Sequence, residues 1–506
     1  MFLMALLVVP LLTAIACRLL YRRRQVMEGL NSLGALVTTL LALVVASDVA
    51  QHGPRDALGG VLYVDALSAV MLATIAVVSL AGAFVSIGYL RRDLAARHIP
   101  DGQRGVGWYY LGLHVFIWTM LVTVSVDNLG LLWVGIEATT LASALLVGFY
   151  RTKAALEAAW KYVILCTVGI TFALFGVLLT YYASAQAMGA EAASLDWSVL
   201  RGGAGQLDPA MMRLAFVFVL VGFGTKAGFA PLHTWLADAH SQAPSPISGM
   251  LSGILLACAL YGILRFHAIT AAATGTNFSA NLLLAFGVLS VAVAVPFIVV
   301  QRDLKRLLAY SSVEHLGLMA VAFGIGGPLG TYAGVLHLVN HAATKALLFF
   351  VAGDIVQRFG TRRISAIRGA VHAAPLAGWL LLFGVFAITG APPAGIFVSE
   401  LAIAGAGLTG TWLQVAAAVT VVLLLGIVFA GMLAHALRLV YGTPFQPLDV
   451  RVSRGGSRSA QVAWWAALVP LVIVVVLLGV VVPEPVSHLF EDVVTALSPV
   501  TRNASQ

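Results

Sequence analysis

Three ionisable residues recur at even spacing in an otherwise apolar stretch, TYAGVLHLVNHAATKALLFF, which covers residues 331–350. His337, His341 and Lys345 are four residues apart, so a helix places them on one stripe about 12 Å long at 1.5 Å rise per residue. In a membrane, a lone charge costs at least about 2.5 kcal/mol and needs a partner or a hydrated cavity. The stripe therefore predicts an ion or proton path. In the alternative interpretation, the histidines are hydrogen-bonded packing groups and Lys345 reaches a membrane interface.

An acid and a base lie in two other apolar stretches. Glu137 lies in LLWVGIEATTLASALLVGF, and Lys226 lies in LAFVFVLVGFGTKAGFAPLHTWL. Because an unpaired buried charge is costly, we expect a Glu137–Lys226 pair. The chain has 5 Lys against 24 Arg, and a desolvated lysine can release its proton whereas arginine cannot. The choice of lysine favours a titrating pair, and the alternative is a static pair that only fixes helix packing.

The second half of the chain repeats this arrangement. Glu314 and Glu400 are 86 residues apart, close to the 89 residues between Glu137 and Lys226. Both partner stretches should be interrupted near the charge, because they contain Gly228 and Pro231 in one case and Gly390, Pro392, Pro393 and Gly395 in the other. Interrupted helices at matching positions are typical of transporter sites at a repeat interface. We therefore expect two inverted five-helix repeats, residues 108–266 and 278–441.

The composition predicts an all-α polytopic membrane protein. The sequence is 60% hydrophobic and 10% charged, with a mean hydropathy of +0.97. About fourteen stretches are long enough to cross roughly 30 Å of hydrocarbon. The expected spans are 2–20, 31–49, 66–89, 108–126, 128–150, 160–183, 211–231, 245–266, 278–300, 307–325, 330–357, 375–402, 412–441 and 461–482.

The basic residues indicate how these spans are oriented. The first span is followed, not preceded, by a positive cluster, so it is not a cleavable signal peptide. Most of the 29 basic residues lie in alternate connections: Arg22–Arg24; Arg91, Arg92, Arg97 and Arg104; Arg151, Lys153 and Lys161; Arg302, Lys305 and Arg306; Arg358, Arg362, Arg363 and Arg368; Arg438, Arg451, Arg454 and Arg458. The other side has only Arg55, Arg201, Arg213, Arg265 and Arg502. The positive-inside rule therefore predicts that both termini lie outside a bacterial or archaeal cytoplasmic membrane.

The sequence contains no recognisable cofactor motif. Cys17, Cys166 and Cys258 lie in separate spans without CxxC spacing, and there is no glycine-rich phosphate loop. We expect no cofactor in this chain. The net charge of +8 is explained by membrane topology, so we expect no nucleic-acid partner. The flanking regions, residues 1–107 and 461–506, are expected to be N-terminal helices and a C-terminal helix with a tail, and the connection 183–210 is expected to be a surface loop.

Three longer strings carry a family resemblance: GFGTKAGFAPLHTWLADAHSQAPSPISGMLSG, DLKRLLAYSSVEHLGLMA and HLVNHAATKALLFF. They resemble the antiporter-like subunits of respiratory complex I, Mrp-type sodium/proton antiporters and membrane-bound hydrogenases, and above all component F of hydrogenase-4. The resemblance implies that Glu137 and Lys226 are a coupling pair, that Lys345 is a central lysine preceded by His337 and His341, and that Glu400 is an exit group. Ser252 stands where relatives often have His or Lys. We expect no long lateral helix of the kind that some relatives carry.

The resemblance implies a proton-translocating subunit of a redox-driven complex, either a membrane-bound hydrogenase or one similar to NADH:quinone oxidoreductase. Its partners would be other membrane subunits and, through them, a peripheral redox arm. The alternatives are a non-conducting scaffold and an Mrp-like sodium/proton antiporter subunit. Accessory candidates for proton transfer are His233, His240, Ser252, Glu314 and His315. A metal site at His233, Asp238 and His240 is disfavoured because no fourth ligand has typical spacing.

Overall fold

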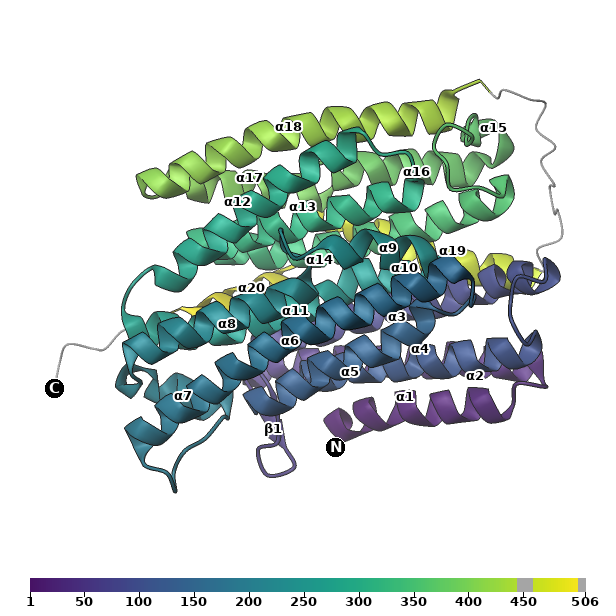
Figure 1. The fold of residues 1–506 in the computed structure, drawn as a ribbon. Helices are drawn as coiled ribbons and strands as arrows, with labels where there is room; N and C mark the ends of the chain where they lie inside the picture. The colour runs from purple at the N-terminus through teal and green to yellow at the C-terminus, as the bar shows by residue number, and fades with distance from the viewer. Residues whose placement is uncertain (444–457, 499–506) are drawn as a thin grey trace.

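The computed structural model describes residues 1–443 and 458–498 as a bundle of long helices (Figure 1). Thirteen helices among these residues are long and apolar enough to cross a membrane. Two shorter apolar helices, α16 (Pro375–Ile388) and α17 (Gly395–Leu408), occupy the predicted span 375–402. When α16 and α17 are counted together as one crossing, the described residues contain fourteen membrane crossings, the number that the sequence predicts. Arg451, Arg454 and Arg502 lie outside the described residues.

The remaining long helices follow the predicted spans closely. Their bounds are α1 (Phe2–Leu19), α2 (Arg24–His52), α3 (Ala66–Ala95), α4 (Gln103–Thr123), α5 (Leu129–Val147), α6 (Lys153–Met188), α8 (Pro209–Ala227), α11 (Leu256–Thr274), α12 (Phe278–Val299), α13 (Leu304–Ile325), α14 (Gly327–Phe359), α18 (Trp412–Tyr441) and α19 (Arg458–Val480).

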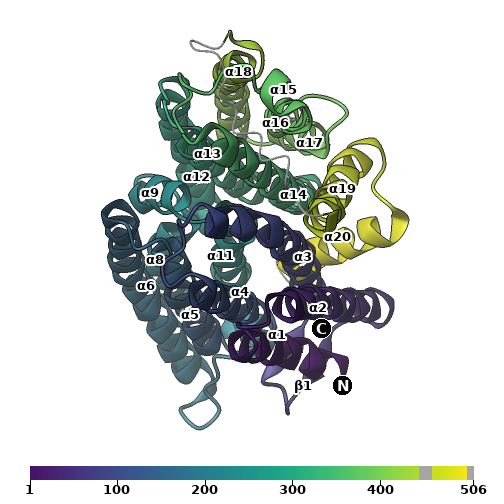
Figure 2. The same cartoon turned by 90° about the vertical axis from the view of Figure 1, so that its right-hand side faces the viewer.

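The helices form three groups when the bundle is viewed along its axis (Figure 2). One group contains α4, α5, α6, α8 and α11, a second contains α12 to α14 with α16 to α18, and the third contains α1 to α3 with α19 and α20 (Glu484–Leu497). Helix α14 packs against members of the second and third groups, including α3, α13, α16, α17 and α19. The predicted histidine–lysine stripe therefore lies on a helix enclosed by protein. The inverted repeats and the domain boundaries stay predictions.

Both predicted helix interruptions are present. Helix α8 ends at Ala227 because Gly228 adopts a left-handed φ of +84° and closes the helix with its backbone N–H. The short helix α9 (Thr234–Gln242) follows. In the second half, α16 and α17 are separated by residues 389–394, where Gly390 has a φ of +71°. The glycines and prolines read from the sequence thus mark real breaks.

A third irregularity was not predicted. The span Ser245–Thr274 consists of α10 (Ser245–Met250), a π-helical segment η2 (Leu251–Leu255) and α11. Such π segments occur mostly as single turns within α-helices and often mark functional sites. Ser252 lies within this segment.

The structure contains short elements that the sequence analysis does not predict. The 183–210 connection contains α7 (Trp197–Gly203) and a 3₁₀ turn, η1 (Ala204–Gln206), because the buried Trp197 indole anchors it to the carbonyl of Arg265 at 3.1 Å. A small antiparallel hairpin, β1 (Arg55–Ala57) and β2 (Leu62–Val64), follows α2. The predicted C-terminal tail contains α20, whose buried face includes Phe490 and Val493. Helix α20 is amphipathic, so a search for uniformly apolar spans misses it.

The arginine-rich connections meet at one end of the bundle. Arg151 lies 3.0 Å from Asp101, Arg306 lies 2.7 Å from Asp238, and Asp303 pairs through its backbone with Arg363. We call this end the basic face, defined by the connections 20–23, 96–102, 148–152, 300–303 and 360–369. The charge pattern read from the sequence therefore corresponds to one contiguous surface.

Candidate functional site

Lys226 lies in the last turn of α8, directly before the break, and is completely buried. Its Nζ donates to Thr140 Oγ1 at 2.8 Å and to the hydroxyl of Tyr162. The Tyr162 hydroxyl also lies 2.7 Å from Ser143 Oγ. Thr140 and Ser143 belong to α5 and Tyr162 to α6. Neighbouring helices thus supply neutral oxygen ligands to one buried ammonium group.

Glu137 does not form the direct pair with Lys226 that we predicted. Its Oε1 accepts a hydrogen bond from Thr167 Oγ1 at 2.9 Å, and the described residues contain no Glu137–Lys226 ion pair. The reason is local: Thr140 lies one turn after Glu137 on α5 and takes the contact with Lys226, while the carboxylate turns toward α6.

His337, His341 and Lys345 are all buried on α14. His337 lies between two neighbours: its Nε2 is 3.0 Å from Nδ1 of His315 on α13, and its Nδ1 is 2.9 Å from Oγ of Ser399 on α17. The ring centroid of His341 lies 5.4 Å from that of His315. The stripe therefore joins α13, α14 and α17.

Lys345 does not reach a membrane interface. Its Nζ donates to the Leu308 carbonyl at 2.9 Å and to the hydroxyl of Ser311, both on α13. The described residues place no carboxylate within ion-pair distance of this group. Lys345 thus resembles Lys226, since each ammonium group is held by neutral oxygens only.

Two carboxylic acids lie near the stripe. Glu314 on α13 is 1% exposed, and its Oε2 has no hydrogen-bond partner among the described residues. Glu400 on α17 is adjacent in sequence to Ser399, and its Oε1 also lacks a partner there. Gly390 makes room for the Glu400 carboxylate, since a Cβ at that position would overlap with it. The second helix break thus provides the space in which this acid sits.

Ser252 provides a contact between the two halves. Its Oγ lies 2.7 Å from Oγ of Ser312, which follows Ser311 on α13. Since Ser311 binds Lys345, hydroxyl groups extend from the π-helical segment to the edge of the α14 stripe. A hydroxyl both donates and accepts hydrogen bonds, although it does not titrate in the physiological range.

His233, Asp238 and His240 do not converge. The His233 ring lies 6.2 Å from that of Tyr310, and Asp238 pairs with Arg306 at the basic face. His240 lies in the interior against the rings of Trp235 and Phe349. Among the described residues, no group of three or more His, Cys, Asp or Glu side chains is placed to hold a metal ion.

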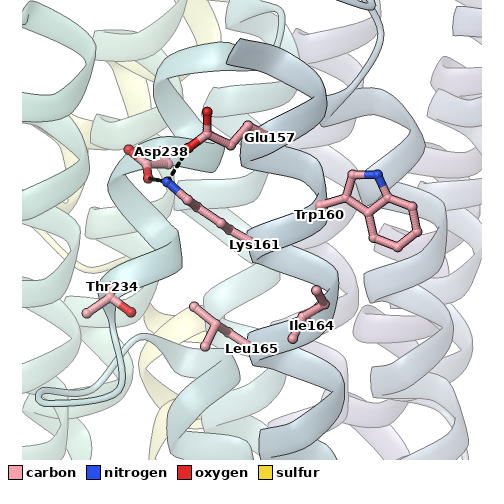
Figure 3. Close-up of a pocket in the computed structure, with 7 residues that line it drawn as sticks. All are labelled: Glu157, Trp160, Lys161, Ile164, Leu165, Thr234 and Asp238. Atoms are coloured by element: carbon pink, nitrogen blue, oxygen red, sulfur yellow. Dashed lines mark hydrogen bonds and ion pairs between the residues drawn. The ribbon is translucent and has the colours of Figure 1, made fainter. Parts of the chain in front are cut away.

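A hollow of about 610 Å³ opens between α6 and α9, beside the first break (Figure 3). Lys161 lies there between Glu157, at 2.6 Å, and Asp238, at 3.5 Å. This half-exposed lysine has two carboxylate partners, whereas the buried Lys226 and Lys345 have none among the described residues. The exposed lysine is thus held by charge, and the two buried lysines are held by neutral oxygens.

Sequence reasoning misses two buried basic residues. The charge pattern places Lys305 in a connection, but it lies in the first turn of α13, is 3% exposed and donates to the Ala243 carbonyl at 2.5 Å. The same pattern places Arg265 on the outer surface, but it is 2% exposed and forms a bidentate pair with Asp65 at 2.5 and 2.7 Å. The sequence carries one sign that these two residues are buried, which is their position: both continue the helical pattern of an apolar span.

A multi-pass bundle with two interrupted helices, one beside the buried Lys226 and the other beside the partly exposed Glu400, defines an antiporter-like membrane subunit. The chain belongs to the transmembrane NADH:quinone oxidoreductase/Mrp antiporter family, whose model matches residues 126–426. It is 41% identical to a hydrogenase-4 component F homolog of Methylacidiphilum infernorum over 347 residues, which are 68% of this chain and 72% of the relative. It is 30% identical to NADH-quinone oxidoreductase subunit N of Desulforudis audaxviator, with 71% of each chain covered.

Solved structures share the fold over nearly the whole chain. A chain of the Mrp complex from Dietzia sp. DQ12-45-1b superposes with a TM-score of 0.83 at 21% identity, covering 98% of this chain and 97% of that one. A chain of an archaeal membrane-bound sulfane sulfur reductase gives a TM-score of 0.82 at 24% identity, with 98% of both chains covered. Both matched chains are parts of multisubunit membrane complexes.

Proposed function

We propose that this chain is a proton-translocating subunit of a redox-driven membrane complex. The observation that supports the proposal best is that Lys226 and Lys345 are completely buried and are held only by neutral oxygens among the described residues. Without a carboxylate to fix its charge, a desolvated lysine can alternate between its ammonium and amine forms. Two such lysines in one chain fit a proton path better than they fit structural ion pairs.

The proposed path uses these groups in order. A change in the charge around Glu137 alters the protonation of Lys226 at the first break. The Ser252–Ser312 contact and the neighbouring Ser311 lead to Lys345 on α14. His341, His315 and His337 then connect Lys345 to Ser399, with Glu314 nearby, and Glu400 releases the proton at the second break.

The source of energy lies outside this chain in the proposal. Redox groups belong to partner subunits, including a peripheral redox arm, as the names of the hydrogenase-4 and NADH-quinone oxidoreductase relatives suggest. The complex sits in a bacterial or archaeal cytoplasmic membrane with the basic face toward the cytoplasm and both termini outside, as the positive-inside rule predicts.

A second candidate function is that of a cation/proton antiporter component of the Mrp type. The fold match to the Mrp complex favours it, as does 32% identity over 308 residues to a component of a probable K(+)/H(+) antiporter of Rhizobium meliloti, of which the match covers 30%. Transport in vesicles that requires sodium or potassium, and that proceeds without electron transfer, would favour this candidate.

The proposal is tested with Lys345→Met in the native complex. Methionine keeps the apolar stem but removes the proton-carrying group, so the complex should assemble and transfer electrons while proton uptake into inside-out vesicles is lost. The matched control is Lys153→Met, because Lys153 is exposed at the basic face. Wild-type proton uptake by Lys345→Met would overturn the proposal.

A further inference from the structure

A third buried lysine lies between the basic face and the α14 stripe. Of the five lysines, Lys226, Lys305 and Lys345 are buried. Lys305 is near the basic-face end of α13, and its ammonium group binds only the Ala243 carbonyl among the contacts that the described residues provide. It therefore resembles the two lysines of the proposed path.

Lys305 lies directly below a polar, partly exposed surface. Two residues before it, Asp303 caps the N-terminus of α13, and the Asp303 carboxylate lies 3.6 Å from Nε of Arg362. The side chains of these two residues are 23% and 34% exposed, respectively. Arg362 also donates to the carbonyl of Ser241, two residues before Ala243. Water at the basic face thus reaches groups adjacent to Lys305.

On its other side, Lys305 is close to the groups that hold Lys345. Leu308 and Ser311, which bind Lys345, are three and six residues further along α13. Six residues of helix correspond to a rise of about 9 Å. The separation is short enough for one intervening side chain to connect the two lysines.

His240 is the candidate for that intervening side chain. It lies three residues before Ala243, and its ring centroid is 5.8 Å from that of Phe349, one turn after Lys345 on α14. Burial lowers the pKa of His240, as do the positive charges of Lys305 and Lys345. His240 therefore stands as a neutral imidazole near both the Ala243 carbonyl that Lys305 binds and the turn of α14 that follows Lys345.

Neither ring nitrogen of His240 makes a hydrogen bond of normal geometry to the described residues. A buried polar group without a partner costs about 1–3 kcal/mol, so its retention in the interior calls for a function. Neutral imidazole has one N–H donor and one acceptor nitrogen. It can accept a proton at one nitrogen while releasing another from the second.

We propose that Lys305 is the proton donor that reloads Lys345 from the basic face, with His240 as the relay. An N–H bond of the Lys305 ammonium breaks, and its proton binds the acceptor nitrogen of His240. The other nitrogen of His240 releases its proton to the neutral amine of Lys345. Lys305 then regains a proton from water at the Asp303–Arg362 surface. This inference rests on the proposed function, because it requires Lys345 to carry protons.

The competing explanation is that Lys305 only neutralises the carbonyl end of α9. A cation at a helix C-terminus is stabilising, and arginine would serve that purpose equally well. Arginine cannot release its proton in a protein, whereas histidine can. Lys305→Arg and Lys305→His therefore separate a fixed cation from a proton donor.

The experiment compares Lys305→Arg, Lys305→His and Lys305→Met in the native complex. Assembly on native gels, electron-transfer rate and proton uptake per electron into inside-out vesicles are measured for each. We expect Lys305→Arg and Lys305→Met to lose at least about a hundredfold in proton uptake, the low end of what a positioned proton donor contributes. Lys305→His should recover part of it, and His240→Leu should match Lys305→Met. Lys153→Met is the control.

The outcomes separate this inference from the proposed function. If Lys345→Met pumps normally, the proposed function fails, and this inference fails with it. If Lys345→Met is inactive but Lys305→Arg pumps like wild type, only the role of Lys305 is wrong. Should Lys305→Met fail to assemble, the arginine and histidine variants decide the question. Failure of both of these to assemble would make Lys305 a structural residue and overturn the inference.

Discussion

Replacing Tyr162 by phenylalanine removes one of the two oxygen ligands of Lys226 and leaves the rest of the site in place. The Tyr162 hydroxyl accepts from Lys226 and contacts Ser143, whereas Thr140 holds Lys226 independently. The ammonium group also lies 4.6 Å from the centroid of the tyrosine ring, a contact that phenylalanine keeps. The substitution therefore removes a single charge-assisted hydrogen bond.

The size of the effect follows from this contact. A hydrogen bond to a charged group contributes about 1.5–3 kcal/mol, and 1.36 kcal/mol corresponds to a tenfold change in a protonation equilibrium. The loss of the Tyr162 hydroxyl should therefore lower the ratio of protonated to neutral Lys226 about 13- to 160-fold. If Lys226 is loaded in each pumping cycle, proton uptake should fall by at least about tenfold at unchanged electron-transfer capacity.

Tyr109→Phe is a closely matched control. Tyr109 is also completely buried, and its hydroxyl lies 2.8 Å from Oγ of Ser86, but no lysine of the described chain binds it. Both variants lose a tyrosine–serine hydrogen bond, worth about 1 kcal/mol, and only Tyr162→Phe alters Lys226. Proton uptake and electron transfer are measured in inside-out vesicles that contain the native complex. Equal pumping by the two variants would refute the argument that Lys226 is loaded through this site.

Lys226→Arg keeps a positive charge at the first break but prevents deprotonation, so proton uptake should be abolished while the complex assembles. Normal pumping by this variant would make Lys226 a structural cation. A topology reporter fused after Gln506 should be found outside the cell, and one inserted in the Arg358–Arg368 connection should be found inside. Asp65→Asn leaves the buried Arg265 without its carboxylate and should destabilise the chain by about 3–5 kcal/mol in thermal unfolding. Asp48→Asn, which breaks a pair with Arg55 that is about 40% exposed, should leave unfolding unchanged; equal effects of the two substitutions would contradict this reasoning.

The large features of the fold were predictable because they depend on properties that a sequence displays directly. A crossing needs about twenty apolar residues, so the spans could be placed within a few residues. Gly228 and Gly390 adopt backbone conformations that glycine tolerates best, so the two breaks were also visible. The buried stripe on α14 followed from helical spacing alone.

The contacts within the site were not predictable for physical reasons. Thr140 and Tyr162 carry no charge, so nothing in the sequence marked them as the ligands that replace Glu137 beside Lys226. In the sequence, Lys305 resembled the exposed basic residues that follow an apolar span. The amino-acid composition at the edge of a span does not distinguish a buried basic residue from an exposed one. Contacts between distant segments, such as that of Ser252 with Ser312, require the three-dimensional packing.

The position of α20 bears on the direction in which a proton would leave along the proposed path. Near the end of α14 that is opposite the basic face, Tyr332 packs its ring 5.5 Å from that of Phe490, and its hydroxyl lies 3.0 Å from Oγ of Ser487. Helix α20 therefore packs its buried face against α14 at this end. On the proposed path, a proton that passes along His341 and His337 would turn sideways toward Ser399 on α17, and the last leg of its route would run across the bundle instead of along it.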